Sequence, residues 1–299
     1  MVYGAEKFMI GFFIFAISTG LPEISTAIVA SLKKVPDLSV GDLMGASLLN
    51  MTLILGIVLL LAKKIDPGRH LKKKIYQTIS LILLILIGIA FSPKENVFTG
   101  ILLITVYLGS VFLFHAGIPK KTASREIEET EEKMEKVEEK AKLPPKIDVL
   151  LRLAGSLAFL IFSSWVMVHA ASRLASLLHI DLTVIGSIFI AIGTTLPELS
   201  LEVHAVKKKE YDLALGDIFG SSLLNVSFVL GILTLFNPGL SLSFSRYILS
   251  FFLAASVWII QKLLRKKPLQ RWDAYFLLGI FVLYMVYIIL FYKSGMFAH

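Results

Sequence analysis

One stretch of sequence occurs twice in this chain, and this repetition limits the possible folds more than any other feature. The first copy covers residues 10–57 and the second covers residues 185–232, and they align without a gap. Of the 48 aligned positions, 24 are identical. A duplication of this length predicts that the chain folds into two related halves.

The composition places both halves in a membrane. Hydrophobic residues make up 56% of the chain and the mean hydropathy is +0.77, well above the values of a soluble domain. The net charge is +8, but the basic residues lie between apolar runs, where they orient a membrane protein. Nucleic acid is therefore not an expected partner. The absence of cysteine excludes disulfides and thiolate metal sites.

Several apolar runs reach the roughly 20 residues that a helix needs to cross a bilayer. They predict an all-α polytopic membrane protein with about nine transmembrane helices, at residues 8–32, 39–62, 75–92, 97–115, 149–178, 183–206, 212–236, 243–261 and 273–292. The first two segments contain the first copy of the repeat, and the sixth and seventh contain the second. The segment at 149–178 precedes the second copy and has no counterpart before the first, so we expect the first repeat to lack its leading helix.

The loops predict how these segments cross the bilayer. Basic residues concentrate near residues 63–74, 207–209 and 262–271, which lie on one side of the membrane if the segments alternate. The positive-inside rule makes this side cytoplasmic, so we expect a multi-pass plasma-membrane protein with a cytoplasmic N-terminus and an extracellular C-terminus. Because the two copies are five segments apart, they cross in opposite directions. Such inverted repeats are typical of transporters with a site at the bilayer midplane.

A charged segment separates the two halves. We assign residues 1–117 to the first membrane repeat, 118–148 to a charged cytoplasmic linker helix, and 149–299 to the second membrane repeat. Oppositely charged residues four apart, such as Glu129 and Lys133, favour a solvated helix in the linker. A regulatory or ion-sensing linker is the alternative, although no particular residue supports it.

Each copy of the repeat carries a glutamate directly after a proline within an apolar segment. Glu23 follows Pro22, and Glu198 follows Pro197. A carboxylate deep in a bilayer is costly and indicates a functional site. Inverted symmetry brings both glutamates to the same depth, where they stay charged only beside a cation and otherwise bind protons. A simple helix kink at each proline is the alternative, and the repetition of the same glutamate argues against it.

Other oxygen-bearing side chains accompany the two glutamates, and hard oxygen ligands suit Ca²⁺ or Na⁺. Hydroxyl groups one turn earlier come from Thr19, Thr194 and Thr195. The prolines also free backbone carbonyls, which can coordinate cations in broken helices. The second helix of each copy adds the amides of Asn50 and Asn225. Further candidates nearby are Ser47, Ser221, Ser222, Asp42, Asp217 and Glu202.

Some of these candidates have a structural alternative. Asp42 and Asp217 lie near the predicted starts of their helices, where a carboxylate can cap the helix end. Glu202 lies one turn after the second glutamate, and its counterpart in the first copy is Ala27. Glu202 either is solvated at the membrane interface or lies on the path by which ions reach the site. Two GxxxG pairs favour close helix packing rather than ligand contacts: Gly41–Gly45 and Gly216–Gly220.

The two motifs resemble the α-repeats of the cation/Ca²⁺ antiporter superfamily, which includes the sodium/calcium exchangers. AISTGLPE and AIGTTLPE resemble the first α-repeat signature, and GDLMGASLLN and GDIFGSSLLN resemble the helix that follows it. The resemblance implies that Glu23 and Glu198 hold Ca²⁺ and share in Na⁺ binding. It also implies Ca²⁺-supporting hydroxyls at Thr19 and Thr194, carbonyl ligands for Na⁺ at Ala16 and Ala191, hydroxyl ligands of an outer Na⁺ site at Thr195 and Ser221, and a central polar pair at Asn50 and Asn225.

The chain departs from that family pattern near the site. Gly20 and Ala46 stand where the sodium exchangers usually carry hydroxyl residues. Because these positions are the counterparts of Thr195 and Ser221, the resemblance implies that one flanking Na⁺ site lacks side-chain ligands. Three further differences are Asn225 in place of a frequent aspartate, and Asp42 and Asp217 in place of asparagines.

Together the patterns and the resemblance predict a secondary antiporter that exchanges Ca²⁺ for Na⁺ by alternating access at a midplane site. No arrangement of paired catalytic residues supports an intramembrane enzyme, and no cofactor is expected beyond the transported ions. Exchange coupled to H⁺, or of another divalent cation, is the alternative within transport. A membrane cation sensor that does not transport is the alternative from another class. The lipid bilayer, Ca²⁺ and Na⁺ are the expected partners, and a monomer is compatible with the pattern.

Overall fold

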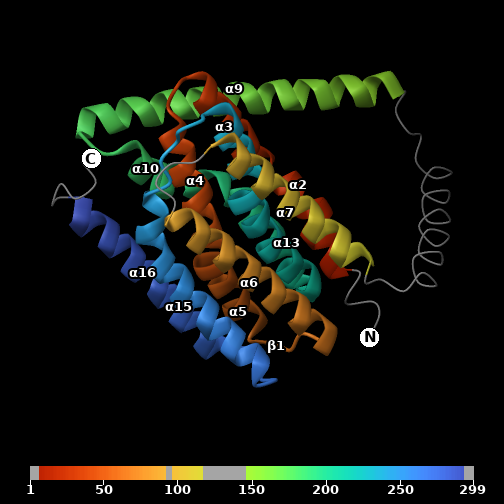
Figure 1. Cartoon of the computed structure of the whole chain (residues 1–299). Coiled ribbons are helices and arrows are strands. Elements are labelled where there is room, and N and C mark those ends of the chain that lie inside the picture. The colour runs from red at the N-terminus through yellow and green to blue at the C-terminus, as the bar shows by residue number, and fades with distance from the viewer. Residues whose placement is uncertain (1–6, 92–95, 117–145, 293–299) are drawn as a thin grey trace.

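The computed structural model describes residues 7–91, 96–116 and 146–292 (Figure 1). Within these ranges, eight helices are long and apolar enough to cross a membrane, or nine if the bent pair Leu182–Thr194 and Leu196–Lys207 is one span. This confirms the predicted all-helical membrane fold, and the helix ends differ from the predicted ends by only a few residues. Most of the predicted linker helix at 118–148 lies outside the described residues.

From the first π-helical turn of each half onward, the helices follow the same order, whereas the short strands lie at different places in it. The first half contains, in chain order, η1 (Gly11–Phe15), α2 (Ala16–Thr19), α3 (Leu21–Leu32), α4 (Pro36–Leu49), η2 (Asn50–Ile54), α5 (Leu55–Ala62), β1 (Lys64–Ile65), α6 (Arg69–Ala90) and α7 (Val97–Ala116). The second contains α9 (Lys146–Leu178), α10 (Leu182–Ile185), η3 (Gly186–Ile190), α11 (Ala191–Thr194), α12 (Leu196–Lys207), α13 (Tyr211–Leu224), η4 (Asn225–Val229), α14 (Leu230–Phe236), α15 (Phe244–Leu264), β2 (Leu269–Gln270) and α16 (Arg271–Tyr292). The segments labelled η are π-helical turns within longer helices.

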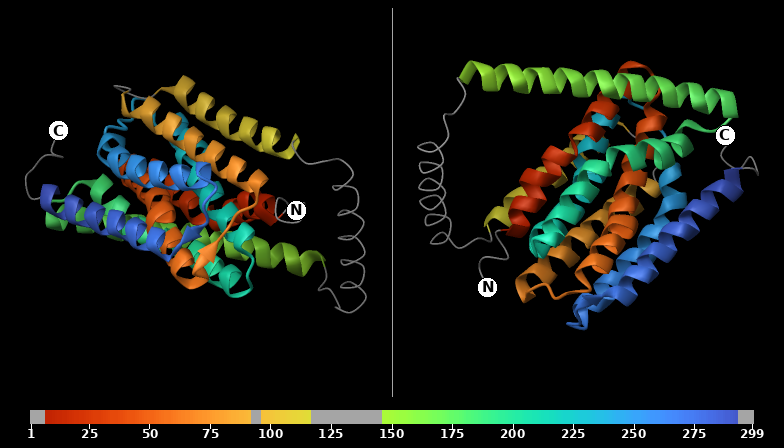
Figure 2. Two further views of the ribbon diagram at one scale, coloured as in Figure 1. Left: turned by 90° about the horizontal axis from the view of Figure 1, so that it is seen from below. Right: turned by 180° about the vertical axis from the view of Figure 1, so that it is seen from behind.

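The two copies of the repeat run in opposite directions, as the sequence predicts. Lys7, at the start of the first span, forms an ion pair with Glu210, which directly follows the sixth span. At the opposite end, Asn237 Nδ2 after α14 donates to Ser31 Oγ near the end of α3 at 2.8 Å. In the centre η1 packs against α13 and η3 packs against α4 (Figure 2). The first helix of each repeat therefore packs against the second helix of the other repeat.

Glycines bring these crossing helices together backbone to backbone. A Cβ atom at Gly41 would lie 2.0 Å from the carbonyl oxygen of Thr183, and one at Gly216 would lie 2.2 Å from that of Phe8. A side chain at either position cannot fit unless a neighbouring backbone moves. This confirms the close packing predicted from the GxxxG pairs and fixes the relative position of the two repeats.

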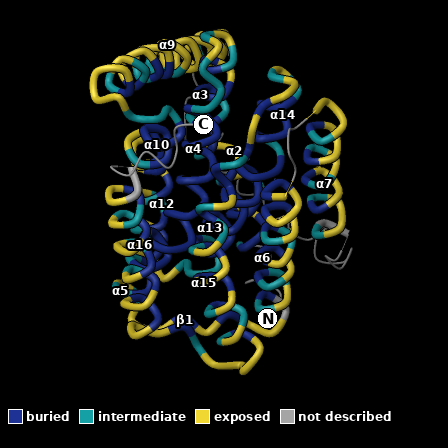
Figure 3. The backbone as a smooth tube through the Cα atoms, turned by 60° about the vertical axis from the view of Figure 1, so that its left-hand side comes forward, coloured by how far each residue is buried: buried dark blue, intermediate teal, exposed yellow. Residues whose placement is uncertain are grey.

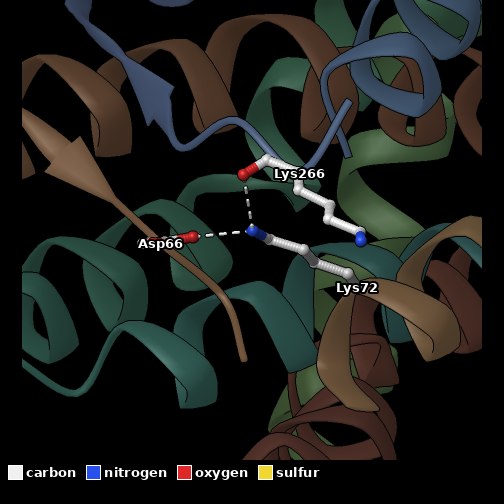
Figure 4. Close-up of polar contacts among 3 residues, drawn as sticks. All are labelled: Asp66, Lys72 and Lys266. Carbon is white, nitrogen blue, oxygen red and sulfur yellow. Dashed lines mark hydrogen bonds and ion pairs between the residues drawn. The ribbon is translucent and has the colours of Figure 1, made fainter. Parts of the chain in front are cut away.

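Two basic loops are joined at one end of the bundle. β1, after α5, pairs antiparallel with β2, before α16. Lys72 Nζ connects the same loops, because it donates to Asp66 Oδ1 at 2.7 Å and to the carbonyl oxygen of Lys266 at 3.4 Å (Figure 4). The loops after the second and eighth spans therefore lie on one side, as the predicted alternation of spans requires.

Burial separates the repeat core from its surroundings (Figure 3). In the most apolar 18-residue stretch of each span, 83% of the residues are buried in 36–62 and in 211–236, but only 6% in 147–178, which belongs to α9. α9 crosses the top of the bundle in Figure 1 and packs against α3, where Lys33 Nζ lies 4.2 Å from the centre of the Trp165 ring. Most apolar side chains of α9 are exposed. Such a surface suits contact with lipid rather than with water.

Candidate cation-binding site

Each glutamate of the repeated motif lies just after a break in its helix. The break separates α2 from α3 in the first repeat and α11 from α12 in the second. In the second repeat, the helical segments before and after the break, Leu182–Thr194 and Leu196–Lys207, meet at an angle of 41°. Pro22 and Pro197 stand in the first turns of the new helices, where a missing N–H group is tolerated. Because proline has no N–H group, the carbonyls of Ser18 and Gly193 cannot form their regular helical bonds. A carbonyl without its regular helical bond therefore lies about one turn before each glutamate.

Glu23 and Glu198 are completely buried, and none of their four carboxyl oxygens has a hydrogen-bond partner. The two carboxyl groups are close enough for their charges to repel one another. Among the described residues, no lysine, arginine or histidine side chain is buried that could neutralise them. An ionised carboxylate that is buried without a partner costs several kcal/mol. This arrangement therefore requires a cation or a proton.

Two bonds between threonine and aspartate cross from one repeat to the other. Thr194 Oγ1 donates to Asp42 Oδ1 at 2.9 Å, and its counterpart Thr19 Oγ1 donates to Asp217 Oδ1 at 3.3 Å. Each aspartate is the seventh residue of its helix, is completely buried and forms no cap. Helix capping, the alternative raised by the sequence, is therefore wrong. The second carboxyl oxygen of each aspartate has no partner, so both aspartates can also contribute to cation binding.

Asn50 and Asn225 are the first residues of two π-helical turns, η2 and η4. Such turns are frequent at functional sites. Asn50 Nδ2 donates to Ser221 Oγ at 2.8 Å, which leaves its carbonyl oxygen unbonded, and neither polar atom of the Asn225 amide has a partner. These turns were not predicted, although they begin at equivalent residues of the two repeats.

The other hydroxyl groups bond to the backbone of their own helices. Thr195 Oγ1 donates to the carbonyl of Ala191 at 2.8 Å. The corresponding carbonyl in the first repeat, that of Ala16, accepts a backbone bond from Gly20 N at 3.0 Å. The remaining serines donate to carbonyls one turn earlier, at 2.7 to 2.8 Å: Ser47, Ser221 and Ser222. A hydroxyl that donates its proton keeps its lone pairs, so each can still be an oxygen ligand.

Glu202 is 0% exposed. This burial contradicts the alternative in which it is solvated at the membrane interface. Neither of its carboxyl oxygens has a hydrogen-bond partner, and the group lies beside Asp217. Asp217 also lies near Glu198, so three carboxyl groups of the second repeat adjoin one another.

These carboxyl groups do not form a compact metal cluster. In the part of the chain that the structure describes, no three His, Cys, Asp or Glu side chains converge closely enough to ligate one metal ion. A bound ion would therefore combine one or two carboxylates with hydroxyl, amide and backbone oxygens. Such a mixture is typical of Ca²⁺ sites and differs from the nitrogen and sulfur ligands of zinc.

A family model described as "Sodium/calcium exchanger protein" matches residues 1–116 and 149–290. This chain belongs to the sodium/calcium exchanger family. The match includes both repeats with their glutamates and omits the charged segment between them. The chain is thus a multi-pass membrane transporter of this family and not an enzyme.

Relatives of this exchanger-family chain occur in bacteria and archaea. The putative antiporter CaxA of Alkalimonas amylolytica is 30% identical, over 80% of this chain and 76% of the relative. The inner membrane protein YrbG of Escherichia coli strain K12 is 29% identical, over 79% and 72%. The sodium/calcium exchanger MaX1 of Methanosarcina acetivorans is 25% identical, over 97% and 90%.

A solved structure shares the fold. The sodium-calcium exchanger NCX_Mj, soaked with 2.5 mM Na⁺ and 0.1 mM Ca²⁺, gives a TM-score of 0.66 with 22% identity, over 95% of this chain and 91% of that one. At this identity the likeness establishes the architecture, and the roles of individual residues depend on the geometry described above.

Proposed function

We propose that this exchanger-family protein moves Ca²⁺ out of the cytoplasm in exchange for Na⁺, by alternating access around Glu23 and Glu198. The observation that carries the proposal is the pair of buried, mutually repelling carboxylates at equivalent positions, with no buried basic residue in the described chain. The name of the archaeal relative MaX1, a sodium/calcium exchanger, supports the same two ions.

The unpaired charges explain why transport would be an exchange. One Ca²⁺, or several Na⁺, neutralises the same two carboxylates. An empty site would have to change sides with two bare charges in a low-dielectric interior, which is costly. The protein would therefore return only after a competing cation has bound, and this requirement couples the movements of the two ions.

The difference in burial suggests which parts move. The glycine contacts lock the central helices together, so α4 and α13 serve as the scaffold. α9 has little buried surface, and its main packing partner is α3. α3 is the helix that carries Glu23. A shift of α9 with α3 would open one side of the glutamate pair and close the other. The basic loops joined by β1 and β2 would face the cytoplasm, under the positive-inside rule.

Proton-coupled Ca²⁺ exchange is the second candidate, and one observation favours it. Gly20 and Ala46 stand opposite Thr195 and Ser221 in the repeat alignment, so a flanking Na⁺ position in the first repeat has no side-chain ligand. Protons need no such ligands, because they bind directly to the carboxylates.

Uptake of ⁴⁵Ca²⁺ into proteoliposomes tests the proposal. Vesicles loaded with Na⁺ and diluted into K⁺ buffer should take up Ca²⁺, whereas vesicles loaded with K⁺ and empty liposomes should not. Uptake driven by a pH gradient alone would establish the proton-coupled alternative. Saturable Ca²⁺ binding in detergent without uptake under any gradient would overturn transport and favour the sensor.

A further inference from the structure

An open groove runs between the third and fourth spans. α6 and α7 lie side by side at the edge of the bundle (Figure 2, Figure 3). α6 packs mainly against α15, whereas α7 packs mainly against α14. Two cavities, with volumes of about 720 and 310 Å³, occupy the space between α6 and α7. Leu81 and Val106 line both cavities, so the two form one groove along the helices.

The larger cavity has a basic end. Lys73, Lys74 and Gln77 of α6 line it there. The neighbouring Lys72 is paired with Asp66, but within the described part of the chain neither Lys73 nor Lys74 forms an ion pair. No described acidic residue lines either cavity. Two positive charges therefore lie at this end of the groove without a counter-charge from the protein.

The rest of the groove is apolar and lies within the membrane-spanning part of the helices. Thr99, the polar exception, donates its hydroxyl to Asn96 Oδ1 at 3.3 Å. Between Gln77 and Ile89 the groove follows about 18 Å of α6, at 1.5 Å per residue. One leaflet takes up about half of the roughly 30 Å hydrocarbon core. The apolar part therefore matches the depth of one leaflet. Its aliphatic wall consists of Leu81, Leu84, Ile85, Ile89, Leu102 and Leu103.

Two glycines keep the groove open. Gly88 lines the narrow part and Gly109 lines the wide part. A Cβ atom at either position would meet no atom within 4 Å. By contrast, a Cβ atom at Gly100, where α7 packs against α14, would lie 2.9 Å from the carbonyl oxygen of Gly231. Gly88 and Gly109 therefore border a space that no described part of the chain fills.

A phospholipid with an anionic headgroup fits both parts of this groove. Lysine ammonium groups bind phosphate, and basic pockets between transmembrane helices bind anionic headgroups. An acyl chain suits the apolar wall that continues from the lysines into the membrane. The acidic segment 125–142 has the same sign of charge as the headgroup, but charged side chains cannot occupy the apolar part without a large cost.

We propose that Lys73, Lys74 and the groove between α6 and α7 bind one anionic phospholipid, with its headgroup at the lysines and an acyl chain along Leu81 and Val106. Under the positive-inside rule this lipid belongs to the cytoplasmic leaflet. Both helices also pack against η4, which begins at Asn225, so the lipid would support the helices behind a candidate ligand of the central site. This link to transport rests on the proposed exchange, whereas the lipid site does not.

Native mass spectrometry of the purified full-length protein in detergent, with added dioleoylphosphatidylglycerol, tests the site. The wild type should retain one phosphatidylglycerol per chain and no phosphatidylcholine. K73Q/K74Q should bind phosphatidylglycerol about 30-fold more weakly, because each lysine near a membrane surface contributes about a factor of five. K63Q/K64Q is the matched control. It removes two exposed lysines that line neither cavity, and it should bind like the wild type.

A second variant separates the groove from the surface charge. G109L keeps both lysines and fills the wide cavity, and leucine favours a helix more than glycine does. It should also lose phosphatidylglycerol. The lipid should raise Tm of the wild type but of neither variant, and glycerol 3-phosphate, which has no acyl chain, should not raise it.

Three results would overturn the lipid site. The first is equal retention of phosphatidylglycerol and phosphatidylcholine by the wild type. The second is wild-type binding of phosphatidylglycerol by K73Q/K74Q or by G109L. The third is a carbodiimide cross-link from Lys73 or Lys74 to the segment 125–142 in the presence of phosphatidylglycerol, because that segment would then be the occupant. All of these measurements are made without an ion gradient, so their failure would leave the proposed exchange untouched.

Discussion

The two repeats share one framework and differ in the ligands that they add to it. Both place a glutamate after a proline, an aspartate against a threonine of the other repeat, and an asparagine at the start of a π-turn. At three of the candidate site positions, however, the second repeat has an oxygen-bearing side chain where the first has none. These are Thr195 for Gly20, Glu202 for Ala27 and Ser221 for Ala46.

The comparison indicates that the residues shared by the two repeats and the residues that differ between them have different roles. An inverted framework can present the same pair of glutamates to either side, which alternating access requires. Among the candidate site residues, the additional oxygens belong to the second repeat. Changes at these positions should therefore have unequal effects in the two repeats, whereas changes at the two glutamates should have similar effects.

The strongest test of the shared framework is to neutralise each glutamate in turn. E23Q and E198Q should each lower Na⁺-driven ⁴⁵Ca²⁺ uptake by about 100-fold or more, because removal of one charged ligand from a buried site typically costs 2–5 kcal/mol. D66N is the control. A tenfold difference between the two glutamate variants would show that the repeats do not share the central ion equally.

The contact between repeats is broken most directly at a glycine. G41A places a Cβ atom 2.0 Å from a backbone oxygen, so it should destabilise the protein by about 3 kcal/mol, the upper end for overpacking. G88A is the matched control, because no atom lies within 4 Å of a Cβ at that helical position. Differential scanning fluorimetry should show a lower Tm for G41A and an unchanged or higher Tm for G88A. Equal melting temperatures would mean that the repeats are not locked together at this contact.

The two threonine–aspartate bonds should differ in strength. Thr194 is almost completely buried and its bond is 2.9 Å long, whereas Thr19 is partly exposed and its bond is 3.3 Å long. Hydrogen bonds to charged groups contribute about 1.5–3 kcal/mol. T194V should therefore raise the Ca²⁺ concentration for half-maximal uptake by about tenfold, and T19V should raise it less. The reverse order would contradict the geometry.

The smallest expected effect comes from making the repeats more alike. In A46S the new hydroxyl can donate to the carbonyl of Asp42, as Ser221 donates to that of Asp217 at 2.8 Å, and can offer its oxygen to Na⁺. We expect the Na⁺ concentration for half-maximal exchange to fall by about threefold to fivefold, which corresponds to about 1 kcal/mol. A fall in Ca²⁺ transport without a change in Na⁺ dependence would show that this position is not a Na⁺ ligand.

The fold could be predicted because the bilayer simplifies the problem. Runs of about 20 apolar residues define the spans, and the odd separation of the copies predicts their inversion. The glutamates could be singled out as candidates because two acids in apolar segments have no ordinary structural role, and the structure buries both of them.

Three features could not be predicted from the sequence and became clear only in the structure. The π-turns leave no trace in segments that are apolar on every face, so Asn50 and Asn225 could be named as ligands but not as turn residues. Asp42 was considered a cap because its helix was predicted to start at residue 39, whereas α4 begins at Pro36. Glu202 lies close to three lysines in the sequence, which suggests a solvated helix end, but α13 covers it. Burial of this kind depends on the tertiary neighbour and not on the local sequence.

The central claim is that Ca²⁺ and Na⁺ compete for the carboxylates of Glu23 and Glu198. The most direct measurement is the release of ⁴⁵Ca²⁺ from the purified protein as NaCl replaces KCl at constant ionic strength and pH. We predict that Na⁺ releases the central ion along a sigmoidal curve, because several Na⁺ replace one Ca²⁺, and that E23Q loses this component. Retention of Ca²⁺ at all Na⁺ concentrations, with release only on acidification, would contradict Na⁺ exchange at this pair.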